Sequence, residues 1–418
     1  MSFEDREIFV YSDWLDAPTM IGKLFSNVIR GKESFSFEYN EKWLHLNSGR
    51  FMFDPELNYY QGRQFNITKP LFGVFMDSCP DRWGRLLMKR REALLARKES
   101  RKIKTLTESD YLLGVYDESR MGALRFSLEE GGAFVADDER LSAPPWLSLR
   151  ELECASRAFE ENQDGEEEKW LHQLIAPGSS LGGARPKASV RASDDSLWIA
   201  KFPSKNDEWD SGAWEMVVYK LAGMCGLNLS EARVEKFSQY GSTFLVKRFD
   251  RVGERRIHFS SAMTLLGKTD GESGNTSYLD MASFIKGNGA FPQMDLAELW
   301  LRIVFYMAVS NTDDHLRNHG FILCNEGWKL SPLYDVNPNI YEDRLSLNVS
   351  LYDSMLDFEL ALEVAKYFEL SINEAKEKVE MIRDIVIKNW QLLARECGLS
   401  RKEIEYMEPA FALCRQKG

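Results

Sequence analysis

The sequence predicts an α+β protein in which strands dominate roughly the first 250 residues and helices dominate the remainder. Polar and apolar residues alternate over 34–39, as in a strand with one buried face. A second alternation over 187–202 is interrupted by Asp194-Asp195-Ser196, which predicts a hairpin with a polar turn. Over 295–310, and again from 358 onward, apolar residues recur at helical spacing.

The remaining elements follow from the same signals in chain order. A strand over 8–11 opens the chain, and Pro80 introduces a basic helix that reaches about residue 97. We then expect a short helix over 109–115, a return strand over 120–126, a helix over 212–224 and a strand over 243–250. The last part contains the helix 295–310, the hairpin 320–323/328–330 and the helices 358–368, 372–393 and 401–415. These patterns divide the chain into segments 1–130, 131–250 and 251–418.

Composition and charge limit the class of protein. The chain has 418 residues, 44% hydrophobic and 28% charged, with a net charge of −12, as in an ordinary globular protein with more than one core. The acidic balance argues against a protein that coats nucleic acid by itself. Six scattered cysteines, a charged N-terminus and no long apolar run predict a cytoplasmic protein with reduced thiols and no membrane span.

The strongest chemical signal lies directly after the helix 295–310. Asp313 and Asn318 are five positions apart, and Asp335 follows the next predicted hairpin. This spacing matches the protein-kinase pattern in which an Asp receives the nucleophile's proton, an Asn holds Mg²⁺ and a later Asp binds metal.

A kinase also needs groups that hold phosphates, and two upstream features offer them. Gly182 and Gly183 precede the predicted hairpin, where backbone amides can approach phosphate oxygens closely, although most such loops are only turns. Lys201 stands in an otherwise apolar strand, like the strand lysine of kinases. A lysine that protects an edge strand from aggregation is an equally good interpretation of Lys201.

Two weaker features extend the pattern. Glu215 lies near the start of the helix 212–224, where it orients Lys201 or is a carboxylate favoured by the helix dipole. The strand 243–250 occupies the place of the kinase hinge, whose backbone groups read adenine. Because glycine loop, lysine, Asp-x-x-x-x-Asn and final Asp recur in kinase order, we interpret them together as one nucleotide site.

The predicted roles follow from phosphoryl transfer. Asn318 and Asp335 hold Mg²⁺ on the phosphates of ATP, Lys201 and the loop amides bind the remaining charge, and Asp313 deprotonates an acceptor hydroxyl. Mg²⁺ keeps several waters, so two protein ligands suffice. His315 and Arg317 are assigned to the nucleotide side of the site. Arg317 fits a structural ion pair equally well.

Two alternatives stay open within this stretch. Asp314 competes with Asp313 for the catalytic role, but its distance to Asn318 is one residue short. His315 and His319 are spaced i, i+4 beside two carboxylates, which suggests a metallohydrolase. That spacing binds zinc on a helix, whereas this segment is expected between a helix and a strand.

At this point the chain resembles HipA, the serine/threonine-kinase toxin of bacterial HipBA toxin–antitoxin modules. The matching pieces span nearly the whole chain, and those of the C-terminal part are the most specific. They are Arg120-Met121-Gly122-Ala123-Leu124, Ser180–Lys187, Ile199–Pro203, Lys247–Arg251, Thr312–Asn318 and Leu330–Asp335.

The resemblance implies a two-lobed protein-kinase-like fold with a HipA-type N-terminal subdomain, a β-rich N-lobe and an all-helical C-terminal lobe. It implies an ATP- and Mg²⁺-dependent protein kinase that halts growth, typically by phosphorylating an aminoacyl-tRNA synthetase. Asp313 is then the catalytic base, Asn318 and Asp335 the metal ligands, and Lys201 the phosphate contact. The ATP-cradling loop is Gly182, Gly183, Ala184, Arg185, Pro186 and Lys187, and the adenine hinge is Lys247, Arg248 and Phe249.

The resemblance also implies regulation and a partner. Ser180 matches a serine that the family autophosphorylates to switch itself off, with Ser179 beside it as a competing acceptor. A phosphate there adds negative charge where the nucleotide's phosphates bind. The implied partner is a dimeric helix-turn-helix antitoxin, through which the chain contacts DNA only indirectly. Asp314 departs from the small residue common at its position, and an extra carboxylate there alters metal binding or acceptor preference. A catalytically silent regulatory subunit and a lipid or small-molecule kinase are the alternatives.

Overall fold

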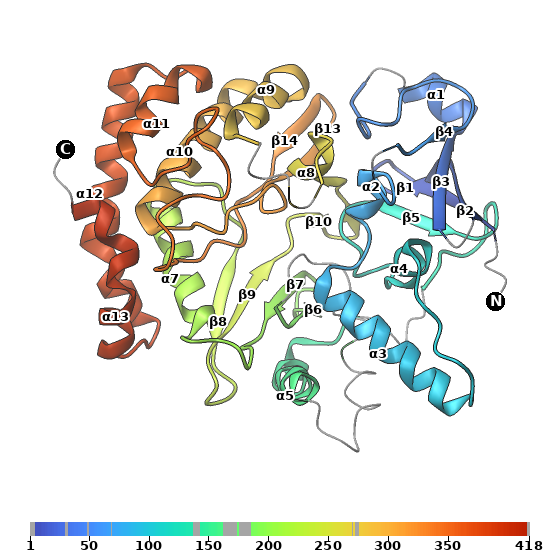
Figure 1. Ribbon diagram of the computed structural model, residues 1–418, viewed down its shortest axis with the longest axis horizontal. Coiled ribbons are helices and arrows are strands. Elements are labelled where there is room, and N and C mark those ends of the chain that lie inside the picture. The colour runs from blue at the N-terminus through green and yellow to red at the C-terminus, as the bar shows by residue number, and fades with distance from the viewer. Residues whose placement is uncertain are drawn as a thin grey trace. The chain divides into compact units, whose positions relative to one another are not determined.

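The computed structural model describes residues 5–29, 32–47, 50–67, 69–136, 143–161, 174, 185–269, 271 and 276–415. The chain divides into two compact units, Met1–Asn206 with Leu245–Ser260, and Asp207–Phe244 with Ser261–Gly418. We call them unit 1 and unit 2, and Figure 1 colours the chain by residue number. The sequence predicted three segments with boundaries near 130 and 250, which do not coincide with the bounds of these two units. The three-part organisation therefore stays a prediction.

Unit 1 begins with a five-stranded sheet of order β4-β3-β2-β1-β5. Each neighbouring pair is antiparallel, so Leu24 lies opposite Phe37 and Val10 opposite Phe126. The predicted strands over 8–11 and 34–39 are confirmed. The return strand begins at Leu124 rather than at 120, because Gly122 adopts a left-handed backbone (φ 74°) just before it. The strands are β1 (Arg6–Ser12), β2 (Thr19–Ile29), β3 (Lys32–Tyr39), β4 (Gln64–Phe65) and β5 (Leu124–Ser127).

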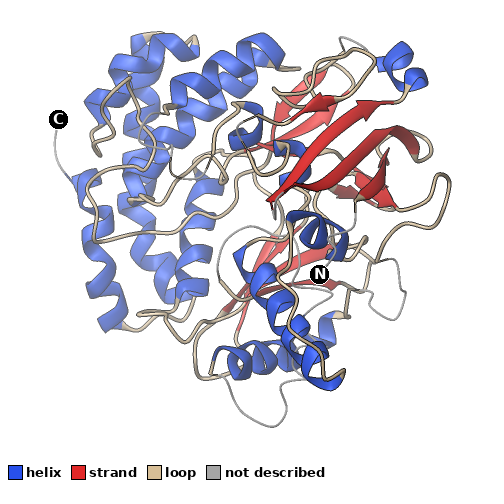
Figure 2. Cartoon of the chain, turned by 45° about the vertical axis from the view of Figure 1, so that its right-hand side comes forward, coloured by secondary structure: helices blue, strands red, loops and turns tan. Residues whose placement is uncertain are grey.

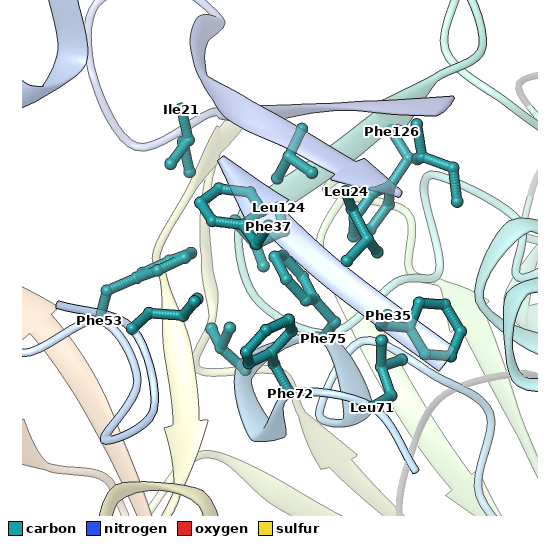
Figure 3. Close-up of a cluster of buried hydrophobic side chains, with 14 of the residues drawn as sticks. Ile21, Leu24, Phe35, Phe37, Phe53, Leu71, Phe72, Phe75, Leu124 and Phe126 are labelled. Atoms are coloured by element: carbon teal, nitrogen blue, oxygen red, sulfur yellow. The ribbon is translucent and has the colours of Figure 1, made fainter. Parts of the chain in front are cut away.

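The apolar residues of these strands form one hydrophobic core (Figure 3). Phe35 and Phe37 are two residues apart on β3, so both point to the same face of the sheet. The ring of Phe37 lies 5.4 Å from that of Phe75, which belongs to the short helix α2 (Gly73–Met76). Burying each such side chain contributes about 1.5–3 kcal/mol, so this core stabilises the N-terminal sheet independently of any catalytic feature.

Two further helices of unit 1 have well-defined starts. Asp81 caps α3 (Arg82–Lys98) by accepting a hydrogen bond from the amide of Gly84, and Thr107 begins α4 (Glu108–Gly114) with a capping box. The predicted helices near these positions are confirmed. Among the described residues, this part also contains α1 (Glu41–Asn47), α5 (Leu149–Glu160) and a short 3₁₀ turn, η2 (Trp146–Ser148).

The predicted hairpin is present as β6 (Lys187–Arg191) and β7 (Leu197–Lys201). Asp195 takes a left-handed conformation in its turn (φ 63°), which Asp tolerates better than most residues. The strand β9 (Thr243–Lys247) follows β7 in the sheet order, and its last three residues belong to unit 1. The chain then forms β10 (Arg251–Val252), β11 (Arg255–Arg256) and β12 (Phe259–Ser261).

Unit 2 is built around α10 (Pro292–Val309), which is apolar on almost every side and buried along most of its length. Proline in its first turn favours initiation there. The indole of Trp300 donates to the carbonyl oxygen of Ala361 at 2.9 Å, which ties α10 to α11 (Phe358–Val364). Figure 2 shows the helices of this unit in blue. The others are α7 (Ser211–Met224), α8 (Ala262–Leu265), α9 (Tyr278–Asn288), α12 (Ile372–Glu396) and α13 (Arg401–Met407), with η4 (Ala365–Phe368) and η5 (Glu408–Arg415).

Unit 2 also contains strands. β8 (Ala232–Glu235) follows α7 and precedes β9 along the chain. β13 (Gly320–Cys324) pairs with β14 (Gly327–Leu330) and forms the predicted hairpin. The buried carboxylate of Asp295 accepts from the amide of Leu330 at 2.9 Å, fixing this hairpin to the start of α10. The expectation of an all-helical C-terminal lobe is therefore too strict. No described helix is long and apolar enough to cross a membrane.

Candidate active site

The candidate site is set by the end of α10. Ser310 takes a left-handed conformation (φ 50°), and its hydroxyl donates to the carbonyl oxygen of Ala410 at 2.8 Å. The amide of Asn311 still donates to Tyr306 at 2.9 Å, so the helix turns sharply and then stops. The loop 312–319 therefore starts from a rigid, buried support.

Within this loop the two neighbouring aspartates have opposite environments. Asp314 is fully buried, and its Oδ2 accepts a hydrogen bond from the hydroxyl of Tyr278 and lies 2.8 Å from Nε2 of His319. Asp313 is exposed. Asp314 therefore anchors the loop, and Asp313 is the carboxylate that a substrate can reach.

Asn318 is oriented by the backbone of the same loop. Its Nδ2 donates to the carbonyl oxygen of Asp313 at 3.1 Å, and its own amide donates to His315 at 2.8 Å. The side chain is nearly buried. Because the nitrogen is committed to Asp313, the side-chain oxygen is the atom left to face a cation.

Asp335 is delivered by the segment that leaves β14. The amide of Leu333 donates to the carbonyl oxygen of Asn228 at 2.8 Å, and the hydroxyl of Tyr334 donates to the carbonyl oxygen of Arg317 at 2.7 Å. Asp335 itself has a left-handed backbone (φ 59°) and is partly exposed. Such a conformation is several-fold enriched in Asp.

The chain after Asp335 is tied back to the loop. Oδ1 of Asn311 accepts from the amide of Asn337 at 2.9 Å, and Oγ1 of Thr312 accepts from the side chain of Asn339 at 2.7 Å. The carbonyl oxygen of Thr312 accepts from the amide of Ser346 at 3.0 Å. These contacts hold the residues on both sides of Asp313 and Asp335 in one arrangement within unit 2.

The carboxyl of Asp313 has a raised pKa. Partial removal from water raises the pKa of its carboxyl, His315 opposes this, and the negative charges of Asp335 and Glu342 raise the pKa further. A carboxylate whose proton affinity is raised is a better acceptor for a hydroxyl proton. The effect of Asp335 on this pKa also shows that the two predicted carboxylates interact.

The donor set fits Mg²⁺ better than zinc. Asn318 and Asp335 offer oxygen atoms, which Mg²⁺ prefers, and the bound ion would keep most of its waters. Among the described residues, no group of three or more His, Cys, Asp or Glu is arranged to hold a metal. His319 is engaged with Asp314 and buried, and the loop is not helical, so the geometry does not favour the zinc alternative.

Unit 1 carries the predicted phosphate-binding residues, and two of its lysines differ sharply. Lys187 and Lys201 are directly opposite each other on β6 and β7. Lys187 is buried, with its Nζ 3.2 Å from Oδ2 of Asp81, whereas Lys201 is only partly buried. Lys187 thus holds α3 to the hairpin through Asp81, which the sequence did not suggest.

Other predicted nucleotide contacts have local structural partners. Nε of Arg185 donates to the carbonyl oxygen of Phe202 at 3.1 Å, and the amide of Phe202 donates to the carbonyl oxygen of Pro186 at 2.9 Å. Nζ of Lys247 lies 3.8 Å from a carboxylate oxygen of Asp194. The ring of Phe249 lies 5.9 Å from that of Phe259. These bonds fix both ends of the hairpin.

The side chain of Arg248 has a structural role. It is completely buried, bonds to both carboxylate oxygens of Asp250 at 2.8 and 2.6 Å, and donates to the carbonyl oxygens of Ser119 and Arg120. Arg251 binds the same carboxylate at 2.7 Å, and these guanidinium groups hold the pKa of Asp250 far below its usual range despite burial. The motif 247–251 therefore joins the end of β9 to the segment 119–122.

The remaining predicted residues are only partly described. Glu215 is buried in α7 of unit 2, and its pairing with Lys201 of unit 1 stays a prediction. Ser179, Ser180, Gly182, Gly183 and Ala184 lie outside the described residues.

Several contacts that build the site were not predicted. Tyr278 and His319 hold Asp314, while Asn311, Thr312 and Asn339 connect the two loops. Polar residues crowd these loops in the sequence, but nothing in their spacing says which ones bond to each other.

The comparisons with known proteins agree with this geometry. Residues 179–407 match the model of the HipA-like C-terminal domain, which is more than half of the chain. The fold is similar to a solved structure of the Shewanella oneidensis MR-1 toxin–antitoxin system of HipA, HipB and operator DNA. That match has a TM-score of 0.69 and 17% identity, and covers 98% of this chain and 96% of the other.

Two curated relatives come from Sinorhizobium fredii (strain NBRC 101917 / NGR234). "Putative kinase Y4mE" is 28% identical over 48% of this chain, and the alignment spans only 43% of that protein. "Putative kinase Y4dM" is 27% identical over 66% of this chain and 68% of its own length. With the domain model covering most of both predicted kinase lobes, the chain belongs to the HipA-like C-terminal domain family, with a two-lobed, kinase-like α+β fold.

Proposed function

We propose that the protein is a HipA-type kinase that transfers the γ-phosphate of ATP to a serine or threonine of a protein. The observation that carries this proposal is the arrangement in unit 2. Asp313 is exposed, and its carbonyl oxygen accepts a hydrogen bond from the side-chain nitrogen of Asn318. The carboxyl of Asp313 also interacts electrostatically with that of Asp335. Family membership and the kinase names of both curated relatives support the same activity.

In this proposal the residues divide the chemistry. Bound Mg²⁺ neutralises charge on the transferring phosphoryl group. Asn318 and Asp335 hold the ion through oxygen atoms, and Lys201 with the loop 182–187 binds the nucleotide phosphates. Asp313 orients the acceptor hydroxyl and accepts its proton as the oxygen attacks phosphorus. The strand end at 247–249 reads adenine through backbone groups.

The proposal also includes a partner protein, a substrate protein and a mechanism that switches the kinase off. The complex of HipA, HipB and operator DNA in the related structure supports a HipB-like helix-turn-helix antitoxin as partner in the cytoplasm. A translation component such as an aminoacyl-tRNA synthetase is the proposed target. Phosphorylation at Ser180 or Ser179 would place about two negative charges beside the phosphate-binding loop and switch the kinase off.

The proposal is tested by incubating the purified protein with Mg²⁺ and γ-labelled ATP. Kinase activity gives label on protein, and mass spectrometry finds phosphate on the peptide that contains Ser179 and Ser180. Nucleotide binding with no protein-bound phosphate, in the presence or absence of a cell extract, would contradict the proposal.

A further inference from the structure

The most basic part of this acidic chain is α3 with the residues that follow it. Ten basic and two acidic residues lie between 82 and 104, a net charge of +8 in a chain whose total is −12. The kinase proposal gives this segment no role. A strongly basic segment in an otherwise acidic chain is typical of a protein that binds a polyanion.

Part of this charge is used inside unit 1. Arg85 pairs with Glu108 at 2.6 Å, Arg101 with Glu92 at 2.6 Å and Lys104 with Asp110 at 2.8 Å. The first two pairs, together with Trp83 against Phe159 at 5.2 Å, hold α3 in unit 1, and the third holds the segment after it to α4. The helix is therefore held rigidly in place by its inner residues.

The outer residues keep their charge. Five exposed cations of the segment have no ion pair with any residue that the structure describes, namely Arg82, Lys89, Arg91, Arg97 and Lys102. Three of them recur every two turns along one uninterrupted helix (Figure 1). At 100° per residue, Arg82, Lys89 and Arg97 fall within about 80° of each other around the axis, and at 1.5 Å per residue they span about 22 Å.

We propose that this basic stripe, Arg82, Lys89 and Arg97, is a binding site for the phosphate backbone of double-stranded DNA. B-DNA carries one negative charge per about 1.7 Å of its axis, so a straight row of cations about 22 Å long faces several phosphates at once. Arg and Lys both bind phosphate oxygens. The site is independent of catalysis and departs from the expectation that DNA is contacted only through a partner.

Duplex DNA fits the stripe better than a single-stranded nucleic acid does. Proteins that bind unpaired bases stack them on exposed aromatic side chains. The one aromatic residue of α3 is Trp83, which is 2% exposed and packed inward. The apolar residues exposed on the helix are Leu86 and Leu95, which offer no such platform. The stripe thus recognises charge and spacing rather than sequence.

The test measures binding of the full-length protein to a fluorescein-labelled random-sequence duplex of about 25 base pairs, by anisotropy between 50 and 200 mM NaCl. The variant is R82Q/K89Q/R97Q. Its matched control is K286Q/K376Q/K402Q, which removes three charges from exposed lysines of unit 2. Thermal melting checks that both variants fold as the unaltered protein does, since every altered residue is exposed.

The unaltered protein and the control should bind with a dissociation constant on the order of micromolar at low salt. The stripe variant should bind more weakly, and its slope of log affinity against log salt should be shallower by about 2–3, since each phosphate contact contributes roughly 0.9. Equal slopes for the stripe variant and the control would overturn the proposal. So would binding of poly-glutamate or single-stranded RNA without binding of the duplex. Kinase activity is not needed for either result, so failure of the site and failure of the proposed function are distinguishable.

Discussion

The carboxylate of Asp314 lies 2.8 Å from Nε2 of His319, and both side chains are completely buried. The hydroxyl of Tyr278 donates to the same carboxylate oxygen. Asp314 therefore connects the loop after α10 to α9 and to the first residues before β13. Because this neighbour is fixed inward, Asp313 is left on the outside of the loop, where a hydroxyl substrate can approach it.

The first prediction separates these two aspartates by stability. Asp314→Ala leaves the Tyr278 hydroxyl and the His319 ring buried without their partner, and should lower the free energy of unfolding by about 2–4 kcal/mol. Asp313→Ala removes an exposed carboxylate and should change it by less than about 0.5 kcal/mol. Urea denaturation of both variants is the measurement. Equal destabilisation would show that Asp314 is not the anchor.

The second prediction concerns the two proposed metal ligands. Removing one oxygen donor in Asn318→Ala or Asp335→Ala should raise the Mg²⁺ concentration for half-maximal activity by about tenfold or more, since loss of a ligand interaction costs at least about 1.4 kcal/mol. Titration of labelled phosphate transfer with MgCl₂ measures it. Asn325→Ala, in the exposed turn between β13 and β14, is the control. An unchanged Mg²⁺ requirement in both variants would remove these residues from the metal site.

The third prediction separates the paired lysines of the hairpin. Lys187→Met leaves the buried carboxylate of Asp81 without its cation, so it should lower the free energy of unfolding by about 3 kcal/mol. Lys201→Met should instead reduce phosphate transfer at least about a hundredfold by weakening the hold on the nucleotide phosphates. Thermal melts and initial rates are measured for both, with the exposed Lys236→Met as control. The reverse assignment of effects would contradict the account.

The fourth prediction is a pH dependence that starts from Asp295. Burial raises the pKa of its carboxyl to about 6, against a partial opposing effect of the hydrogen bond from Leu330. The folded state therefore holds this proton more tightly than the unfolded chain, with a pKa near 3.8. Its contribution to stability is complete below about pH 4 and is lost as the pH rises through 6.

Asp295→Asn removes the ionisation but keeps an oxygen that can accept from Leu330. At pH 7.5 the variant should be more stable than the unaltered protein by up to about 3 kcal/mol, since each unit of pKa shift corresponds to about 1.4 kcal/mol. At pH 4 the two should be equal. Chemical denaturation at both values measures this, and a constant difference across the range would exclude the titration of Asp295 as its cause.

Much of the secondary structure could be predicted because it rests on local patterns. The period of α10 and the alternation of β3 are carried by side chains that are buried where the pattern requires. The hairpins at 187–201 and 320–330 followed from turn residues between alternating segments. The last part is mainly helical, as the spacing of apolar residues predicted, and its hairpin over 320–330 is the one that the alternation there predicted.

The roles of individual charged residues were harder to read. The side chains of Lys187 and Arg248 are each buried against a carboxylate, Asp81 and Asp250 respectively, and the assignment of both residues to the nucleotide site stays a prediction. Whether a lysine faces a ligand or a distant carboxylate depends on tertiary contacts that spacing along one segment does not contain. The left-handed backbone conformations of Ser310 and Asp335, at the two loops of the site, were not predicted from the sequence either.

The most direct test of the account is the transfer of labelled phosphate from Mg-ATP by Asp313→Asn. This change keeps the size of the side chain but removes the proton acceptor, so the rate of phosphate incorporation should fall by about 10²–10⁴-fold while the melting temperature stays unchanged. Asp343→Asn, at an exposed position, should retain full activity. Undiminished phosphate incorporation in Asp313→Asn would contradict the role of Asp313 as the base.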